Sequence, residues 1–152
     1  MATLASHIYG GEMIYEFMSR NADGSKKYRI TLRLFRDNSG GAMAAQLPNT
    51  VLIGIYDYET KTYHPAMQSS YSVVRTNGPN PVPVNVSPCI TGSFIADYSV
   101  ASYSLVIDLP ANKEGYICSF ETCCRVNNLA NVFHAGGIGG TGSTYVCRIP
   151  GT

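Results

Sequence analysis

The feature of this chain that most constrains its fold is its clearest alternation of apolar and polar residues, from Lys27 to Arg36. Successive side chains on a β-strand point to opposite faces, so the alternation predicts a strand with one apolar face. That face carries Tyr28, Ile30, Leu32 and Leu34. The other face carries Arg29, Thr31, Arg33 and Phe35. The turn-forming run Asp37-Asn-Ser-Gly-Gly41 then ends the strand.

Similar strand signals recur along the chain and are separated by turn residues about every 8 to 15 positions. We expect further strands at 7–18, 51–58, 71–75, 116–125 and 144–149, and either two strands or one long bent strand at 94–109. The Gly10-Gly11 pair predicts a bulge or bend in the first of these, and the run from Asn21 to Gly24 predicts a turn. The prolines between Thr76 and Pro83 predict an extended segment. Helical periodicity is nearly absent, with one weak, short candidate near 127–133.

This pattern predicts an all-β chain, an antiparallel β-sandwich of about seven to nine strands, Ig-like or jelly-roll-like. A chain without helices cannot easily build the crossovers that parallel strands require. Within the strand at 51–58, Val51, Ile53 and Ile55 should face inward. A length of 152 residues fits one domain with a substantial core, and no boundary or internal repeat divides residues 1–152.

Composition excludes two classes of partner. Charged residues make up 14% of the chain, and its formal net charge is +1. Nucleic acids and anionic membranes attract clustered Lys and Arg, so we expect this chain to bind neither. No stretch approaches the ~18 apolar residues of a membrane helix, so we expect no membrane insertion. Neutral polar residues and 11 Tyr replace the charges, which is common in secreted β-rich modules.

The five cysteines indicate an oxidising compartment, because four of them fall in the last third of the chain. Cys123 and Cys124 are adjacent, so on a strand they would point to opposite faces. A metal site or a thiol nucleophile would need Cys118 or His134 beside them. Neither spacing is typical of zinc sites, and no hydrolase signature surrounds them. We therefore expect no catalytic residues and no cofactor, and favour structural disulfides.

Two weaker signals concern ligands. Asp37 and Asp57 are candidate calcium ligands through their carboxylate oxygens, although turn residues of this kind usually cap backbone groups. We otherwise expect no metal. Tyr56, Tyr58, Tyr63 and Tyr71 are candidates for a ligand-binding face that stacks on sugars. Packing within the sheet is the alternative role for these rings. The run 136–142 is rich in glycine but lacks the lysine of a phosphate-binding loop, so we expect a hairpin loop there.

Several segments together carry a resemblance to a known family: Ala5 to Tyr15 with A-S-H-I-x-G-G-E, Tyr28 to Asp37 with L-R-L-F-R-D, Val84 to Thr91, and Gly115 to Asn127 with C-C-R-x-N. The chain resembles the N-terminal module of large secreted Bacteroidetes surface proteins. Those proteins often carry PKD or other Ig-like repeats and end in a gliding-motility-associated C-terminal sorting domain. The resemblance implies type IX secretion and a place on the cell surface or outside the cell. We expect the chain to be excised from a longer protein, just after a removed signal.

The resemblance also bears on the cysteines. Cys118 and Cys147 look like additions to the family pattern on sequential strands, which implies that they pair with each other. Cys89 would then pair with one of the adjacent cysteines, and Cys124 is favoured over Cys123. Relatives often have a cysteine where this chain has Asn38, so the family's disulfide pattern does not transfer as a whole.

The leading functional hypothesis is a non-catalytic module of a bacterial surface adhesin or filament-like protein. Its expected partners are surface polysaccharide or neighbouring modules of the same protein. The alternative is a carbohydrate-binding module accessory to a secreted polysaccharide-degrading enzyme. It requires an exposed aromatic platform, so complete burial of the four tyrosines would count against it. A third hypothesis, an enzyme that uses Cys124 and His134, requires a free thiol beside the imidazole.

Overall fold

The structure, a computed structural model, describes residues 8–39, 46–83, 87–89, 97–122 and 142–151. These residues form seven β-strands and no helix. The strands are β1 (Ile8–Arg20), β2 (Lys26–Asp37), β3 (Thr50–Asp57), β4 (Ser70–Pro81), β5 (Tyr98–Leu109), β6 (Gly115–Thr122) and β7 (Ser143–Pro150). Neighbouring strands are antiparallel throughout. The expected all-β antiparallel class is therefore confirmed. The helix candidate at 127–133 lies outside the described residues.

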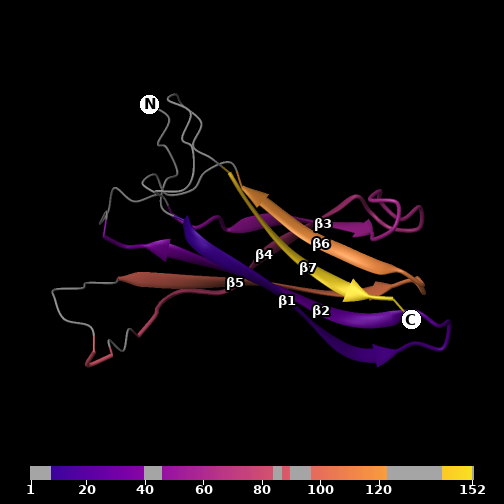
Figure 1. Cartoon of the computed structure of the whole chain (residues 1–152), viewed down its shortest axis with the longest axis horizontal. Helices are drawn as coiled ribbons and strands as arrows, with labels where there is room; N and C mark the ends of the chain where they lie inside the picture. The colour runs from indigo at the N-terminus through magenta and orange to yellow at the C-terminus, as the bar shows by residue number, and fades with distance from the viewer. Residues whose placement is uncertain (1–7, 40–45, 84–86, 90–96, 123–141, 152) are drawn as a thin grey trace.

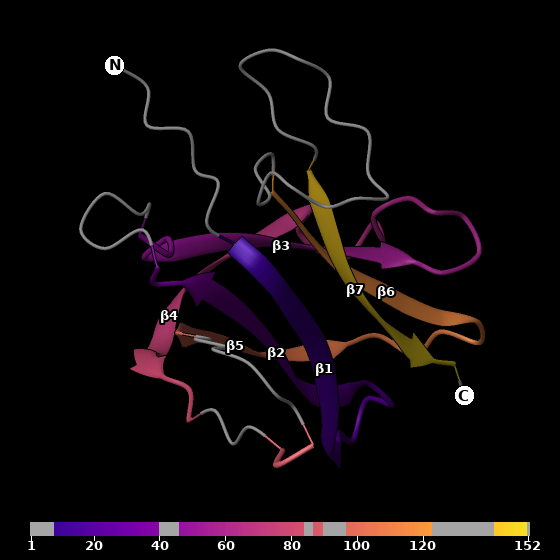
Figure 2. The same ribbon diagram turned by 60° about the vertical axis from the view of Figure 1, so that its left-hand side comes forward.

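The strands follow the order β1-β2-β5-β4-β3-β6-β7 in one continuous sheet (Figure 1). Strand β4 turns the corner of this sheet, because residues 70–74 pair with β3 and residues 75–81 pair with β5. The sheet thus folds over itself into two layers, β1-β2-β5 and β3-β6-β7 (Figure 2). The two edge strands come together near their starts, where a Cβ on Gly11 would lie 2.9 Å from the Tyr145 ring. The single sheet is therefore curled like a nearly closed barrel, whereas two separate sheets were expected.

The core lies between the two layers and draws on all seven strands. The alternation in β2 is confirmed: Ile30, Leu32 and Leu34 are fully buried, and Tyr28 is nearly so. In β3, Val51, Ile53 and Ile55 face the same core, as expected. The remaining buried apolar side chains are Met13, Leu47, Val73, Ala101, Tyr103, Leu109, Tyr116, Cys118, Phe120 and Ile149. Burial of these side chains, at about 25 cal/mol per Å² of apolar surface, is the main favourable contribution to the free energy of folding.

Local signals placed several elements correctly. The bulge expected at Gly10-Gly11 is a register shift between Ile8 and Gly10. The extended segment at Thr76–Pro83 continues β4 as far as Pro81, with two register shifts where it pairs with β5. The stretch at 94–109 contains one strand, β5, which begins at Tyr98 in the described part.

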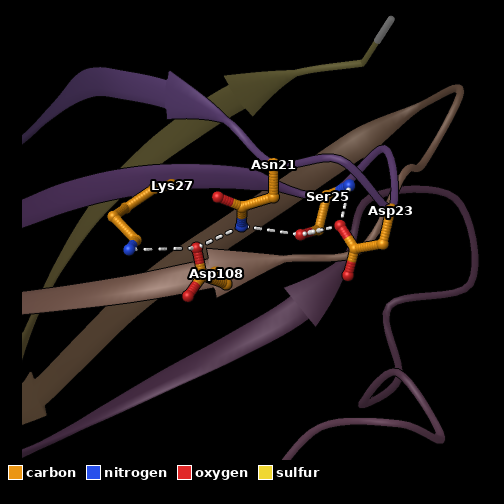
Figure 3. A network of polar contacts seen from close by, with 5 residues as sticks. All are labelled: Asn21, Asp23, Ser25, Lys27 and Asp108. Carbon is orange, nitrogen blue, oxygen red and sulfur yellow. Dashed lines mark hydrogen bonds and ion pairs between the residues drawn. The ribbon is translucent and has the colours of Figure 1, made fainter.

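A polar network fixes the turn between β1 and β2 against β5 (Figure 3). Asn21 donates from Nδ2 to the Asp108 carboxylate at 2.7 Å and to the Ser25 hydroxyl at 2.9 Å. The hydroxyl of Ser25 and then its backbone N–H donate to Asp23, which lowers the pKa of that carboxyl below its usual value. Lys27 lies 3.8 Å from Asp108 as an exposed ion pair. The turn predicted from Asn21 to Gly24 is confirmed, and its side chains hold three strands in register.

Three described glycines, Gly24, Gly78 and Gly115, have a backbone conformation that L-residues rarely adopt, and the space around Gly24 differs from that around Gly115. Gly24 in the β1–β2 turn has φ +87°, with nothing near its missing Cβ. Gly115 at the start of β6 has φ +85°, and a Cβ there would collide with the Ile149 carbonyl oxygen. Gly10 has neither restriction. Alanine substitutions at Gly10, Gly24 and Gly115 therefore distinguish the energetic cost of backbone strain from that of a steric clash.

We predict that Gly24→Ala lowers the free energy of unfolding by about 1 kcal/mol, because it introduces backbone strain alone. Gly115→Ala should cost about 3 kcal/mol or more, because the clash adds to the strain. Gly10→Ala serves as the control and should stay within about 0.5 kcal/mol of wild type. Urea unfolding followed by circular dichroism measures all three. Equal losses at Gly24 and Gly115 would contradict the geometry described for β6.

Candidate functional site

A candidate site lies on the outer face of β3, next to the loop that joins β3 to β4. Since Val51, Ile53 and Ile55 face the core, the intervening side chains of β3 point outward. Tyr56 is one of these, and Tyr63 in the loop folds back onto it. Their rings are stacked, with centroids 4.7 Å apart and an interplanar angle of 26°, and their hydroxyls lie 3.2 Å apart. Tyr63 remains 43% exposed.

The two rings border a shallow depression of about 190 Å³. Its lining consists of Leu52, Gly54, Tyr56, Tyr63, Ser70, Ser119 and Glu121. Gly54 makes room for the Tyr56 ring, because a Cβ at this position would lie 2.8 Å from that ring. Gly54 pairs directly with Ser119 of β6, which brings a hydroxyl to the floor. The depression therefore combines two aromatic rings with two hydroxyls and one carboxylate. We call it the Tyr56–Tyr63 depression.

Electrostatics at the depression are mild. The hydrogen bond with Tyr56 raises the pKa of Tyr63 above its usual value, and burial and the nearby Glu121 carboxylate act in the same direction. The Tyr63 phenol therefore keeps its proton near pH 7 and can donate or accept hydrogen bonds. A neutral ligand that has both apolar faces and hydroxyls matches this lining.

The other two tyrosines of the predicted ligand face lie elsewhere. The ring of Tyr58 is covered by cations: Lys61 Nζ lies 3.6 Å and the Arg148 guanidinium 3.5 Å from its centroid. Tyr71 pairs with Ile53, so it lies on the core side of the sheet and packs against the core. The structure thus brings Tyr56 and Tyr63 together as a site and gives Tyr58 and Tyr71 packing roles.

The two calcium candidates are far apart. Asp37 ends β2 and Asp57 ends β3, and these strands run in opposite directions, so the carboxylates lie at opposite ends of the sheet (Figure 1). Asp57 caps its turn by accepting the backbone N–H groups of Glu59 and Thr60. The Thr60 N–H is the largest cause of its lowered pKa. Within the described ranges, no three His, Cys, Asp or Glu side chains gather in a way that could hold a metal ion.

The cysteines divide into three groups. Cys118 of β6 and Cys147 of β7 are directly opposite each other, both on the core side of the sheet, and both are unbonded thiols here. Cys89 is an exposed thiol. Cys123, Cys124 and His134 lie outside the described residues, as does the glycine run at 136–141.

The opposed thiols of β6 and β7 shift each other's pKa in opposite directions. Their mutual hydrogen bond raises the pKa of Cys118, and burial adds to that effect. The same hydrogen bond lowers the pKa of Cys147, which is only partly buried. Cys147 is therefore the thiol of this pair that ionises first.

Sequence reasoning found Tyr56 and Tyr63 but missed the rest of the depression. The alternation of β3 already contained a signal for Leu52 and Gly54, which must point outward when Val51 and Ile53 point inward. Ser119 and Glu121 depend on the pairing of β3 with β6, which are separated by two other strands in the chain. No local pattern predicts such a pairing.

Comparisons with known proteins add no relative. No family model matches the chain, and neither the curated proteins nor the solved structures contain a match. In the part of the chain that the structure describes, no helix has the length and apolar character needed to cross a bilayer.

We predict that the protein purified without reductant carries a Cys118–Cys147 disulfide, because the two residues are cross-strand partners. The bridge would close a loop of about 30 residues, and the chain-entropy model gives it about 3.6 kcal/mol of stability. Peptide mapping by mass spectrometry under non-reducing conditions should recover the two cysteines in one linked pair. Recovery of both as free thiols, or of Cys118 joined to Cys89, would refute this pairing.

Proposed function

We propose that this chain is a non-catalytic extracellular module of a bacterial cell-surface protein, and that it adheres to polysaccharide through the Tyr56–Tyr63 depression. The observation that carries the proposal is the exposed ring of Tyr63, held by its stack on Tyr56 beside two hydroxyls and a carboxylate. The apolar C–H face of a pyranose ring fits against an aromatic ring, and its hydroxyls need donors and acceptors at the edge. The depression offers both.

The charge distribution supports a neutral partner. Net charge is +1, and Glu121 is the one ionisable carboxylate in the lining. Because no cluster of like charges creates a strong electrostatic potential here, long-range attraction of a charged ligand is weak. The affinity then depends on direct contacts between the ligand and the lining. A shallow site of this size suits one or two sugar units of a longer chain, bound weakly and repeatedly, as adhesion requires.

The secreted location rests on separate support. The five cysteines, low charge and the resemblance to the N-terminal module of large Bacteroidetes surface proteins all favour export to an oxidising environment. A carbohydrate-binding module of a secreted polysaccharide-degrading enzyme would use the same depression. The two hypotheses differ in the domains that accompany the module in its parent protein.

A second candidate function, contact with neighbouring modules, is favoured by the edges of the sheet. Six antiparallel pairings separate β1 from β7, so the two edge strands run in the same direction (Figures 1 and 2). One added strand antiparallel to both would pair with each edge in the preferred way. On β1, Tyr15 and Phe17 share the core-facing side with buried Ile30 and Tyr28 but are themselves exposed. A strand from another module would cover them.

We predict that Tyr63→Ala weakens binding to neutral oligosaccharides about tenfold, since loss of one stacking ring removes on the order of 1.4 kcal/mol. A glycan array identifies the sugar, and isothermal titration calorimetry measures the change. Tyr15→Ala is the matched control, because it removes an exposed tyrosine from β1 and should leave sugar binding unchanged.

Two outcomes would overturn the proposal. If Tyr63→Ala bound sugars as tightly as the wild type does, the depression would not be the site. If the protein bound no glycan but turned over a substrate, it would be an enzyme. A third outcome would favour the edge-strand function. In it, the wild type binds no sugar but associates with itself or with modules of the parent protein, and Phe17→Ser loses that association.

A further inference from the structure

A second hollow lies on the outer face of the other layer, away from the Tyr56–Tyr63 depression. It encloses about 290 Å³ and is lined by Tyr9, Gly10, Phe35 and Tyr98. These residues come from the start of β1, the end of β2 and the start of β5. The three strands are neighbours at this end of the sheet (left in Figure 1). We call it the aromatic hollow. Its volume is at the lower limit of small-molecule sites, which suits a compact chemical group.

The local backbone explains why this hollow exists. The register shift between Ile8 and Gly10 takes Tyr9 out of the regular ladder of β1 with β2. The ring of Tyr9 meets that of Tyr98 edge-on, with centroids 5.3 Å apart and an interplanar angle of 78°. Gly10 pairs with Phe35, and no atom lies within 4 Å of the Cβ that Gly10 lacks. The rings of Tyr9 and Tyr98 are thus nearly perpendicular, and the ring of Phe35 lies beside them. A side chain at position 10 would fill the space between these rings.

Carboxylates flank these rings. Asp37 pairs with Tyr98 in the ladder of β2 with β5 and interacts with the Tyr9 phenol, raising the pKa of Tyr9 above its usual value. It also accepts the backbone N–H and hydroxyl of Ser39 at 2.8 and 2.7 Å. Asp97 precedes Tyr98 and accepts Asn38 Nδ2 at 2.9 Å. Among the described residues, neither carboxylate takes part in an ion pair.

The two basic side chains that precede Asp37 most closely on β2 are Arg33 and Arg36. Arg33 lies on the same face as Phe35 and is paired with Glu12 of β1 at 2.7 Å. Arg36 is buried on the core side of the sheet, opposite to the hollow. It donates from Nη1 to Asn38 Oδ1 at 2.9 Å. The outer end of the sheet at Asp37 and Asp97 therefore presents negative charge beside electron-rich ring faces. Both features attract a cation.

We propose that the aromatic hollow binds an alkylated ammonium group, such as the trimethylammonium head of a choline-bearing surface molecule. Ring faces and a nearby carboxylate stabilise the positive charge. The lining of ring carbons and one glycine offers few acceptors, so a primary ammonium would leave its N–H donors unsatisfied. A trimethylammonium group has no N–H donors and fills the space with methyl groups. A sugar would lose hydrogen bonds from its hydroxyls in the same lining.

The test compares choline with 3,3-dimethylbutan-1-ol, its neutral isostere. Both are titrated into the wild-type protein and followed by the NMR shifts of the aromatic protons. We expect choline to bind about tenfold more tightly than the isostere, which is the difference that cation–π and carboxylate attraction provide at a partly exposed site. Equal affinity for both probes would show an apolar hollow without cation selectivity and would overturn the proposal, as would absence of binding by choline.

Variants then locate the site. Tyr98→Leu keeps an apolar side chain but removes a ring, and it should weaken choline binding about tenfold. Asp37→Asn should weaken it several-fold through lost charge. Tyr63→Leu is the matched control, because it alters an exposed tyrosine of the other site and should leave choline affinity unchanged. If Tyr98→Leu does not fold, Tyr9→Leu replaces it, since Tyr9 is 45% exposed. Unchanged affinity in the ring variants, or equal loss in Tyr63→Leu, would refute the assignment.

Discussion

The double pairing of β4 is the constraint on which the rest of this structure depends. Its first half completes the layer of β3, β6 and β7, and its second half completes the layer of β1, β2 and β5. The two apolar faces can meet only because one strand belongs to both ladders and bends between them. The register shifts near Asn77 mark that bend. Tyr103, fully buried on β5, then donates its hydroxyl to the Pro48 carbonyl at 2.6 Å, which anchors the approach to β3.

The sequence predicted strands, turns and buried faces well, but it did not predict which strands pair with each other. Alternation in β2 was enough to identify which side chains are buried, because burial and period-two geometry produce the same pattern. The turn at Asn21 to Gly24 followed from residue types alone. Strand order was not predictable, since β2 pairs with β5 and β3 with β6 across long intervening segments. For the same reason, the tyrosines were identified as one face, whereas the pairing of Tyr71 with Ile53 places it on the core side.

The two candidate sites use aromatic rings in different ways. In the Tyr56–Tyr63 depression the rings are stacked, and hydroxyls from β4 and β6 lie beside them. In the aromatic hollow the rings of Tyr9 and Tyr98 stand edge-on, and the polar groups are carboxylates outside the lining. Stacked rings with hydroxyls suit a flat, neutral, hydrogen-bonding ligand, whereas crossed rings with charge suit a compact cation. The two layers of one sheet therefore present chemically distinct surfaces.

The shared direction of β1 and β7 has a mechanical consequence. Strand β1 begins at one end of the sheet, and β7 finishes at the other (Figure 1). Tension applied between Ile8 and Pro150 would act along the strand axes. In antiparallel pairs the hydrogen bonds lie perpendicular to the strands, so such tension shears the β1–β2 and β6–β7 ladders and loads their bonds together instead of one after another. The same topology that leaves two edges open thus arranges the sheet to resist stretching.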